Sequence, residues 1–206
     1  AHSFPTRRSS DLGAKLKRLK AALLAGQRIT GVKRHGKQLA LVGERGCVGI
    51  HLGMSGTVTL DEPAAGTTVG LNGPAGVADP GALPPHTHLT WHLKAEGGGD
   101  SGGSDAAPRL HFRDPRRFGG VWVAGSLDEL VSRRWSELGP DALVIRPGEL
   151  HAGLSRTSRG LKPALLDQSV VAGLGNIYVD EALFRAKLHP LAPANAATMR
   201  DVQSLV

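Results

Sequence analysis

The sequence predicts an α+β fold, in which an antiparallel β-sandwich is followed by an all-α domain. Two observations carry this prediction. Short β-rich runs separated by turn residues occupy the first part of the chain, and apolar residues at helical spacing occupy the part after Trp135. A chain of 206 residues is long enough for one large domain or two small ones, and it can bury a core.

The β-rich runs alternate with turn residues at spacings typical of an antiparallel sandwich. They are Ile29–Lys33, Gln38–Val42, Cys47–His51, Gly56–Leu60, His88–Leu93, Arg109–Arg113 and Gly120–Ala124. A helix is expected before them, because leucines recur at helical spacing from Leu12 to Leu23, and Gly26 ends it.

Two insertions interrupt the sandwich, at residues 61–85 and 96–108. Both are rich in Gly and small residues, so we expect surface loops rather than sites. The first dozen residues, AHSFPTRRSSDL, continue into no periodic pattern and are interpreted as a non-native or disordered leader. The expected organisation is therefore a leader over 1–12, a partial sandwich over 13–137, and a truncated helical domain over 138–206.

Two helices are predicted in the last part, over 161–171 and 177–187. A tight turn, Ala172-Gly173-Leu174-Gly175-Asn176, separates them, and a further helix begins near Ala197.

Charge and cysteine content restrict the function classes. The formal net charge of +7 indicates a polyanionic partner. Cys47 is the only cysteine, which excludes an intrachain disulfide and a zinc site of several cysteines; its apolar neighbours favour a buried small side chain over a nucleophile. No run approaches the roughly 18 to 20 apolar residues that span a bilayer. With no membrane partner and no signal peptide, we expect a cytoplasmic protein.

The turn before the second helix is a candidate phosphate site. Gly173 and Gly175 frame a turn that directs Asn176 and the first helical amides outward, and free N–H groups at a helix N-terminus bind anions. Asn176 can cap this helix and donate its amide to an anion. The alternative is an ordinary capped turn between two helices.

The segment DPRRFGG places two guanidinium groups and an aromatic ring beside a hairpin. One interpretation is a minor-groove wedge, in which Phe118 enters between base steps while Arg116 fills the space of an extruded base. Met54, on the loop HLGMSG, could join this wedge. The alternative is a surface arginine paired with Asp114, with Phe118 and Met54 filling a core.

Four segments taken in order carry a resemblance to a known family. They are HLGMSG (51–56), DPRRFGG (114–120), ELGPDAL (137–143) and DQSVVAGLGNIYVDEALFRAKLHP (167–190). This set resembles formamidopyrimidine-DNA glycosylase, of the family shared with endonuclease VIII, over roughly Gly31 to Pro193 without the insertions. The resemblance implies a β-sandwich, a helix-two-turns-helix domain and a C-terminal zinc finger.

Carried over position by position, the resemblance implies a set of site residues. Lys37 matches the lysine that contacts the phosphate at the lesion and supports catalysis. Met54, Arg116 and Phe118 match the residues that fill the void left by the damaged nucleotide. The remaining implied DNA contacts are His51, His86, Arg156, Lys162 and Asn176.

The resemblance also implies chemistry that this chain is expected to lack. The family's nucleophile is an N-terminal proline followed by a glutamate, whereas this sequence begins Ala1-His2-Ser3. The family's zinc is held by four cysteines of a C-terminal finger, so we expect no cofactor in this chain. We therefore expect the chain to bind damaged DNA but to be inactive as a fragment.

The function implied for the intact parent is base-excision repair. It would remove oxidised purines (formamidopyrimidine and 8-oxoguanine) from duplex DNA by base flipping and Schiff-base chemistry, as a glycosylase and AP lyase. The expected partner is double-stranded damaged DNA, bound by a monomer that is nucleoid-associated when bound. The alternatives are a non-catalytic module for damaged DNA, the endonuclease VIII branch acting on oxidised pyrimidines, and an RNA-binding protein.

Overall fold

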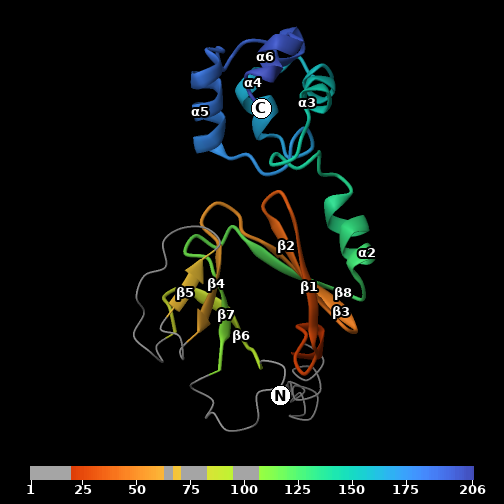
Figure 1. The fold of residues 1–206 in the computed structure, drawn as a ribbon, viewed down its shortest axis with the longest axis vertical. Helices are drawn as coiled ribbons and strands as arrows, with labels where there is room; N and C mark the ends of the chain where they lie inside the picture. The colour runs from red at the N-terminus through yellow and green to blue at the C-terminus, as the bar shows by residue number, and fades with distance from the viewer. Residues whose placement is uncertain (1–19, 63–66, 71–82, 95–106) are drawn as a thin grey trace, which may run out of the picture. The chain divides into compact units, whose positions relative to one another are not determined.

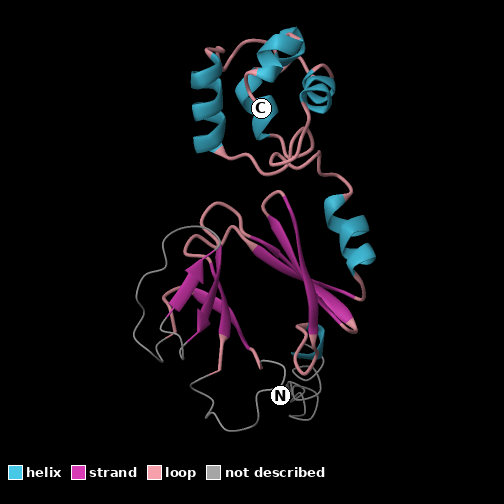
Figure 2. Cartoon of the chain, in the orientation of Figure 1, coloured by secondary structure: helices cyan, strands magenta, loops and turns pink. Residues whose placement is uncertain are grey.

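The computed structural model describes residues 20–62, 67–70, 83–94 and 107–206 (Figure 1). Within these ranges the fold is α+β, as predicted: two four-stranded sheets are followed by short helices (Figure 2). The expected leader lies outside the described residues, as do most of the two insertions. Of the expected first helix the structure describes the end, where Lys20 to Ala22 are helical and Gly26 has φ +68°.

The first sheet has the strand order β1-β2-β3-β8. Its members are β1 (Ile29–His35), β2 (Gln38–Gly43), β3 (Gly46–His51) and β8 (Gly120–Ala124). Strands β1 and β2 form an antiparallel hairpin in which His35 pairs with Gln38, so only Gly36 and Lys37 make the turn. A two-residue hairpin loop favours residues that accept positive φ, and Gly36 has φ +55°.

The second sheet has the strand order β5-β4-β7-β6. Its members are β4 (Thr57–Glu62), β5 (Thr67–Gly70), β6 (Thr87–His92) and β7 (Arg109–Arg113). The central strand β7 pairs antiparallel with both β4 and β6, and Phe112 lies opposite Val58, both buried. Prediction of a loop throughout residues 61–85 was wrong, because Asp61 and Glu62 extend β4 and residues 67–70 pair with it as β5. The β-branched run Thr67-Thr68-Val69 is typical of such a strand.

The helical part begins earlier than the sequence suggested. Ser126 caps α2 (Leu127–Leu130) by accepting a hydrogen bond from the Glu129 N–H, and α2 continues directly into the π-helical turn η2 (Val131–Trp135). The elements that follow are α3 (Pro147–Leu154), α4 (Leu161–Leu166), α5 (Asn176–Ala186), the 3-10 turn η3 (Ala194–Ala196) and α6 (Met199–Gln203). Their apolar faces share one buried cluster, which includes Leu154, Leu161, Leu165, Val179 and Val202.

The prediction of a helix over residues 161–171 was wrong in its length, because α4 ends at Leu166. Asp167 stops it. Its carboxylate accepts hydrogen bonds from the backbone N–H and hydroxyl of Ser169, at 2.9 and 2.6 Å, which is a turn conformation that competes with helix. A turn over residues 168–170 and a β-bridge at Ala172 lie between α4 and α5, and α5 begins one residue before the expected position.

The chain divides into two compact units. One comprises Ala1–Gln27 and Ile50–Trp122, and the other Arg28–Gly49 and Val123–Val206. Domain boundaries after residues 12 and 137 remain predictions. Among the helices that the structure describes, none has the length and apolar character needed to cross a membrane.

Candidate nucleic-acid interface

The β1–β2 turn and the start of α5 approach each other closely within one unit. A Cβ added to Gly36 would lie 2.9 Å from the Ala172 Cβ and 3.0 Å from the Gly173 backbone nitrogen. A Cβ added to Gly175 would lie 3.0 Å from the Lys37 Nζ. The turn thus packs on the loop that leads into α5, and the Lys37 ammonium lies beside Gly175, the residue just before this helix.

The Lys37 ammonium has no hydrogen bond or ion pair with any residue in the described ranges. Burial lowers the pKa of Lys37 below its usual value, because desolvation disfavours the charged form. A half-buried cation without a counter-ion is energetically unfavourable unless an anion reaches it. The position therefore favours the binding of an anionic ligand.

The start of α5 adds backbone donors to this position. Its N-cap is Gly175, which has no side chain to cap the helix, and the first helical hydrogen bond runs from the Val179 N–H to the Gly175 oxygen. The prediction that Asn176 caps the helix was wrong: it is the first helical residue and is exposed. Free N–H groups and the positive end of the helix dipole favour an anion here.

Gln168 shapes the turn before α5, and sequence reasoning missed it. Its amide nitrogen donates to the Leu166 and Leu174 oxygens, at 2.9 and 3.1 Å, and its Oε1 accepts from the Gly173 N–H at 2.9 Å. One side chain thus satisfies three backbone groups between α4 and α5. The only signal in the sequence was a long polar side chain preceding a glycine-rich turn.

Replacing Gly36 with alanine is expected to lower the free energy of unfolding by about 2 kcal/mol or more, because the position combines positive φ with backbone contacts that leave no space for a Cβ. The same change at Gly31, in the same hairpin, serves as the control. A Cβ there meets nothing within 4 Å. Chemical denaturation measures both changes, and equal stabilities of the two variants would contradict the close approach of the turn to residues 172–173.

The other unit presents three of the predicted DNA contacts on two neighbouring loops. Met54 is 68% exposed and Phe118 is 55% exposed. The guanidinium carbon of Arg116 lies 4.8 Å from the centre of the Phe118 ring, in a cation–π contact. The loops touch, since a Cβ on Gly53 would lie 2.7 Å from the Phe118 carbonyl carbon. Large apolar side chains held outward are available for insertion into another molecule.

A buried carboxylate, Asp114, ties these two loops together. It is 1% exposed and accepts hydrogen bonds from the Gly119 N–H at 2.6 Å, the Ser55 hydroxyl at 2.7 Å and the Arg116 N–H at 3.3 Å. Burial alone would raise the pKa of Asp114, but these hydrogen bonds outweigh it and hold the pKa below its usual value. The alternative of a surface arginine paired with Asp114 and a buried Phe118 is therefore wrong; the buried phenylalanine is Phe112.

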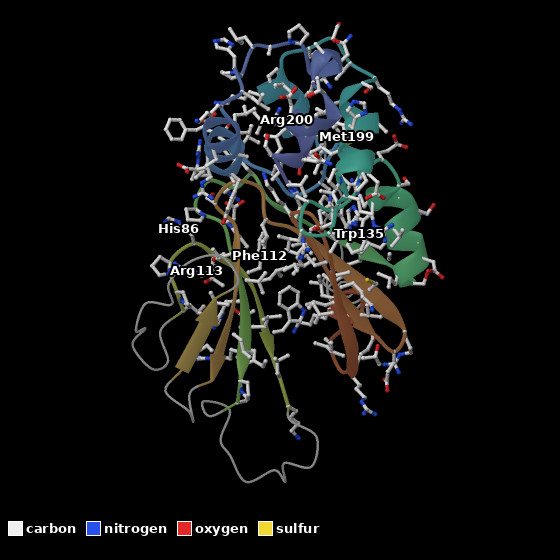
Figure 3. All side chains as sticks on the ribbon, turned by 45° about the horizontal axis from the view of Figure 1, so that its top comes forward. His86, Phe112, Arg113, Trp135, Met199 and Arg200 are labelled. Carbon is white, nitrogen blue, oxygen red and sulfur yellow. The ribbon has the colours of Figure 1, made fainter. Side chains whose placement is uncertain are left out.

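The two predicted histidines flank these loops. His51 ends β3, and its ring centroid lies 6.1 Å from that of Trp122. His86 is exposed with φ +61°, and its carbonyl oxygen accepts from the Asp114 N–H at 3.1 Å. In Figure 3, His86 and Arg113 lie close together, consistent with the hydrogen bond from the Arg113 Nε to the Pro85 oxygen.

The two basic residues predicted in the helical part occupy different settings. Lys162, in the first turn of α4, pairs with Asp180 of α5 through Nζ–Oδ1 at 2.7 Å. A phosphate at Lys162 must therefore share this cation with a carboxylate. Arg156 follows α3 and is exposed.

The described residues do not fit a structural zinc site. They contain no group of three His, Cys, Asp or Glu side chains that could hold a metal ion. Cys47 is fully buried in β3, and burial raises the pKa of its thiol, as expected for a small core side chain.

Comparisons with known proteins identify the family of the chain. A family model described as the formamidopyrimidine-DNA glycosylase N-terminal domain matches residues 5–121, and one described as the formamidopyrimidine-DNA glycosylase H2TH domain matches residues 138–206. Proteins named formamidopyrimidine-DNA glycosylase from Acidiphilium cryptum and Rhodospirillum rubrum are 37% and 39% identical to the chain. They cover 86% and 89% of it.

Solved structures of Fpg proteins are also similar to the chain. The MutM (Fpg) protein of Thermus thermophilus matches with a TM-score of 0.64 and 34% identity, over 89% of this chain and 58% of that one. Lactococcus lactis Fpg in complex with abasic-site DNA matches with a TM-score of 0.66 and 29% identity, over 92% and 60%. The chain spans 60% of the length of the Acidiphilium relative and 57% of the Rhodospirillum one. By both domain models, the chain belongs to the formamidopyrimidine-DNA glycosylase family.

Proposed function

We propose that this chain supplies the DNA-binding surfaces of a base-excision repair glycosylase and AP lyase that acts on oxidised purines. The observation that carries the proposal is the half-buried Lys37 ammonium, which has no ion-pair or hydrogen-bond partner among the described residues, beside the start of α5, where no side chain caps the helix. The relatives are named for formamidopyrimidine, and Lactococcus lactis Fpg structures are titled as complexes with abasic-site and Fapy-dG containing DNA. Double-stranded damaged DNA is accordingly the proposed partner, and the nucleoid the proposed place of action.

Lys37 and the first amides of α5 suit a backbone phosphate rather than a base. A phosphate presents several acceptor oxygens, and here it would meet one ammonium and the N–H groups of a helix N-terminus. Exposed Asn176 can donate its side-chain amide to the same anion. Such contacts fix the register of a duplex without reading its sequence. We propose that this phosphate adjoins the damaged nucleotide.

Met54, Arg116 and Phe118 suit the space vacated by a flipped base. The arginine is already oriented by its contact with the Phe118 ring, so less side-chain entropy is lost on insertion. Unstacking costs a few kcal/mol and costs least where a base is already damaged or absent. A preference for abasic and oxidised sites follows from this difference.

The part of the chain that the structure describes offers no set of ligands for the zinc that the resemblance implies for the intact family. A single cysteine cannot supply four thiolates, and Cys47 is buried in a strand. The proposed contribution of these residues is to bind and orient the duplex.

Competition binding of the chain to matched duplexes tests the proposal. The duplexes carry one abasic-site analogue, one 8-oxoguanine, one oxidised thymine or no lesion. We expect the abasic duplex to bind most tightly, followed by 8-oxoguanine. A preference for oxidised thymine over 8-oxoguanine would support the pyrimidine branch, and equal affinity for all four would contradict the proposal.

Truncating the wedge is expected to remove the preference for damage. Phe118→Ala should lower affinity for the abasic duplex by about tenfold, because stacking of a base on an aromatic side chain is worth about 1–3 kcal/mol per base. Arg116→Ala should lower it as well, because the vacated space is then left unfilled. Affinity for the undamaged duplex should change less. Phe184→Ala is the control, since Phe184 is another exposed phenylalanine, on α5. Anisotropy titrations measure these affinities, and an unchanged abasic preference in Phe118→Ala would exclude the wedge.

A further inference from the structure

Asp141 lies outside the residues proposed to touch DNA, yet its carboxylate accepts four hydrogen bonds close to Lys37. It is 7% exposed and sits between η2 and α3. Its Oδ2 accepts from the Gly36 N–H and from the Arg34 Nη1, each at 2.7 Å. Its Oδ1 accepts from the Arg34 Nη2 at 3.0 Å and from the Leu143 N–H at 2.9 Å.

The Arg34–Asp141 ion pair holds the β1–β2 turn through the backbone N–H and the backbone carbonyl of Gly36. Asp141 accepts from the Gly36 N–H, and the Arg34 Nη1 also donates to the Gly36 oxygen at 2.9 Å. Gly36 immediately precedes Lys37, so the backbone from which the lysine extends is fixed by the Arg34–Asp141 pair. A bidentate arginine–carboxylate pair fixes orientation as well as distance.

The same aspartate is anchored to the loop that leads into α5. Asp141 and Ala172 form a parallel β-bridge, with hydrogen bonds from the Ala142 N–H to the Ala172 oxygen and from the Ala172 N–H to the Pro140 oxygen, at 2.8 and 2.9 Å. Asp141 thus joins the two segments whose closeness places the Lys37 ammonium beside Gly175.

We propose that Asp141, paired with Arg34, is a positioning residue that holds Lys37 at the start of α5, ready for a DNA phosphate. This inference rests on the proposed function. Asp141 itself touches no DNA. Its effect on binding passes through the position of Lys37.

Whether DNA affinity rises or falls when the charge of Asp141 is removed distinguishes a positioning role from a purely electrostatic one. Removing a negative charge from a protein that binds a polyanion should raise its affinity. If Asp141 positions Lys37, Asp141→Asn should instead lower affinity, because an asparagine cannot accept the four hydrogen bonds that the carboxylate accepts. Asp201→Asn is the matched control. It removes the same charge in the same unit, in the capping box that begins α6.

A double-mutant cycle with Lys37→Met then tests whether the effect passes through the lysine. Affinity for the abasic-analogue duplex is measured for the two single variants, the double variant and Asp201→Asn, at one salt concentration and below each melting temperature. We expect Asp141→Asn to weaken binding by about fivefold, a coupling typical of residues in one network. In the Lys37→Met background it should have no further effect, and Asp201→Asn should leave affinity unchanged or slightly higher.

The outcomes separate the inference from the proposed function. If Lys37→Met leaves affinity unchanged, the phosphate site at Lys37 is wrong and the inference fails with it. If Lys37→Met weakens binding but Asp141→Asn does not, the phosphate site stands and the positioning role is overturned. Additive losses in the double variant also overturn positioning through Lys37.

Arg34→Lys provides a milder test should Asp141→Asn unfold. It keeps the positive charge but loses the forked geometry and, with it, the simultaneous contacts to Asp141 and Gly36. We expect a smaller loss of affinity that also vanishes in the Lys37→Met background. A loss that persists in that background would overturn the inference. Circular dichroism melts establish that each variant is folded.

Discussion

Replacing Asp114 with alanine is expected to lower the free energy of unfolding by about 2–4 kcal/mol, because it leaves buried donors without their acceptor. The Gly119 N–H and the Ser55 hydroxyl lose their 2.6 and 2.7 Å hydrogen bonds. The loops that carry Met54, Arg116 and Phe118 should then separate. The variant should therefore also lose its preference for abasic DNA, at temperatures where it is still folded. Chemical denaturation and competition binding measure the two effects.

Asp128→Ala is the control for this variant. Asp128 is exposed in the first turn of α2, so its loss should cost no more than about 0.5 kcal/mol. If Asp114→Ala proves as stable as Asp128→Ala, the buried hydrogen bonds of Asp114 do not hold the two loops.

Acid should remove the same stabilisation in the unmodified protein. The folded-state pKa of Asp114 lies below its usual value, so its carboxylate stabilises the fold above the unfolded-state pKa of about 3.9. This contribution is lost as the pH falls from there through the folded-state pKa. Asp114→Asn should therefore show a flatter decline of stability below about pH 4 than the unmodified protein.

Replacing Lys37 with methionine is expected to weaken DNA binding by about tenfold, since hydrogen bonds to charged groups contribute about 1.5–3 kcal/mol. Methionine keeps the length and apolar stem of the side chain but removes its charge. The slope of log K against log salt should become shallower by about 0.9, the value for one phosphate contact on duplex DNA. Because burial of an unpaired cation is unfavourable, the variant should be no less stable than the original.

Lys33→Met is the matched control, since Lys33 is an exposed lysine of the same hairpin. Its loss removes the same charge without altering the position beside α5, so affinity should fall less. Equal losses for the two lysines would mean that Lys37 contributes only to the general positive field.

Much of the fold could be predicted because it depends on local periodicity. Short β-rich runs mark the strands of the sandwich, apolar residues recur at helical spacing around α5, and turn residues mark the boundaries. The errors arose at the ends of helices. The side chain of Asp167 ends α4 through its contacts with Ser169, and the N-cap of α5 is Gly175, so that Asn176 is the first helical residue.

The exposed candidate residues could be singled out from the sequence, and their role in binding stays a prediction, whereas the residues that hold their loops could not be singled out. Met54, Arg116 and Phe118 stand out in sequence because of their types and glycine neighbours. Asp114 and Asp141 appear only as aspartates next to proline, since their partners are Ser55, 59 positions away, and Arg34, 107 positions away. Hydrogen bonds over such separations leave no local signal, so only the folded structure reveals which carboxylates are buried.

Lys37 and the start of α5 are proposed to hold one backbone phosphate next to the damaged nucleotide. A scan of duplexes tests it directly, each carrying an abasic-site analogue and a single neutral methylphosphonate at one position near it. We predict one position at which the neutral group weakens binding of the original chain by about tenfold but leaves binding of Lys37→Met unchanged. Losses of the same size for both proteins at every position would contradict the claim.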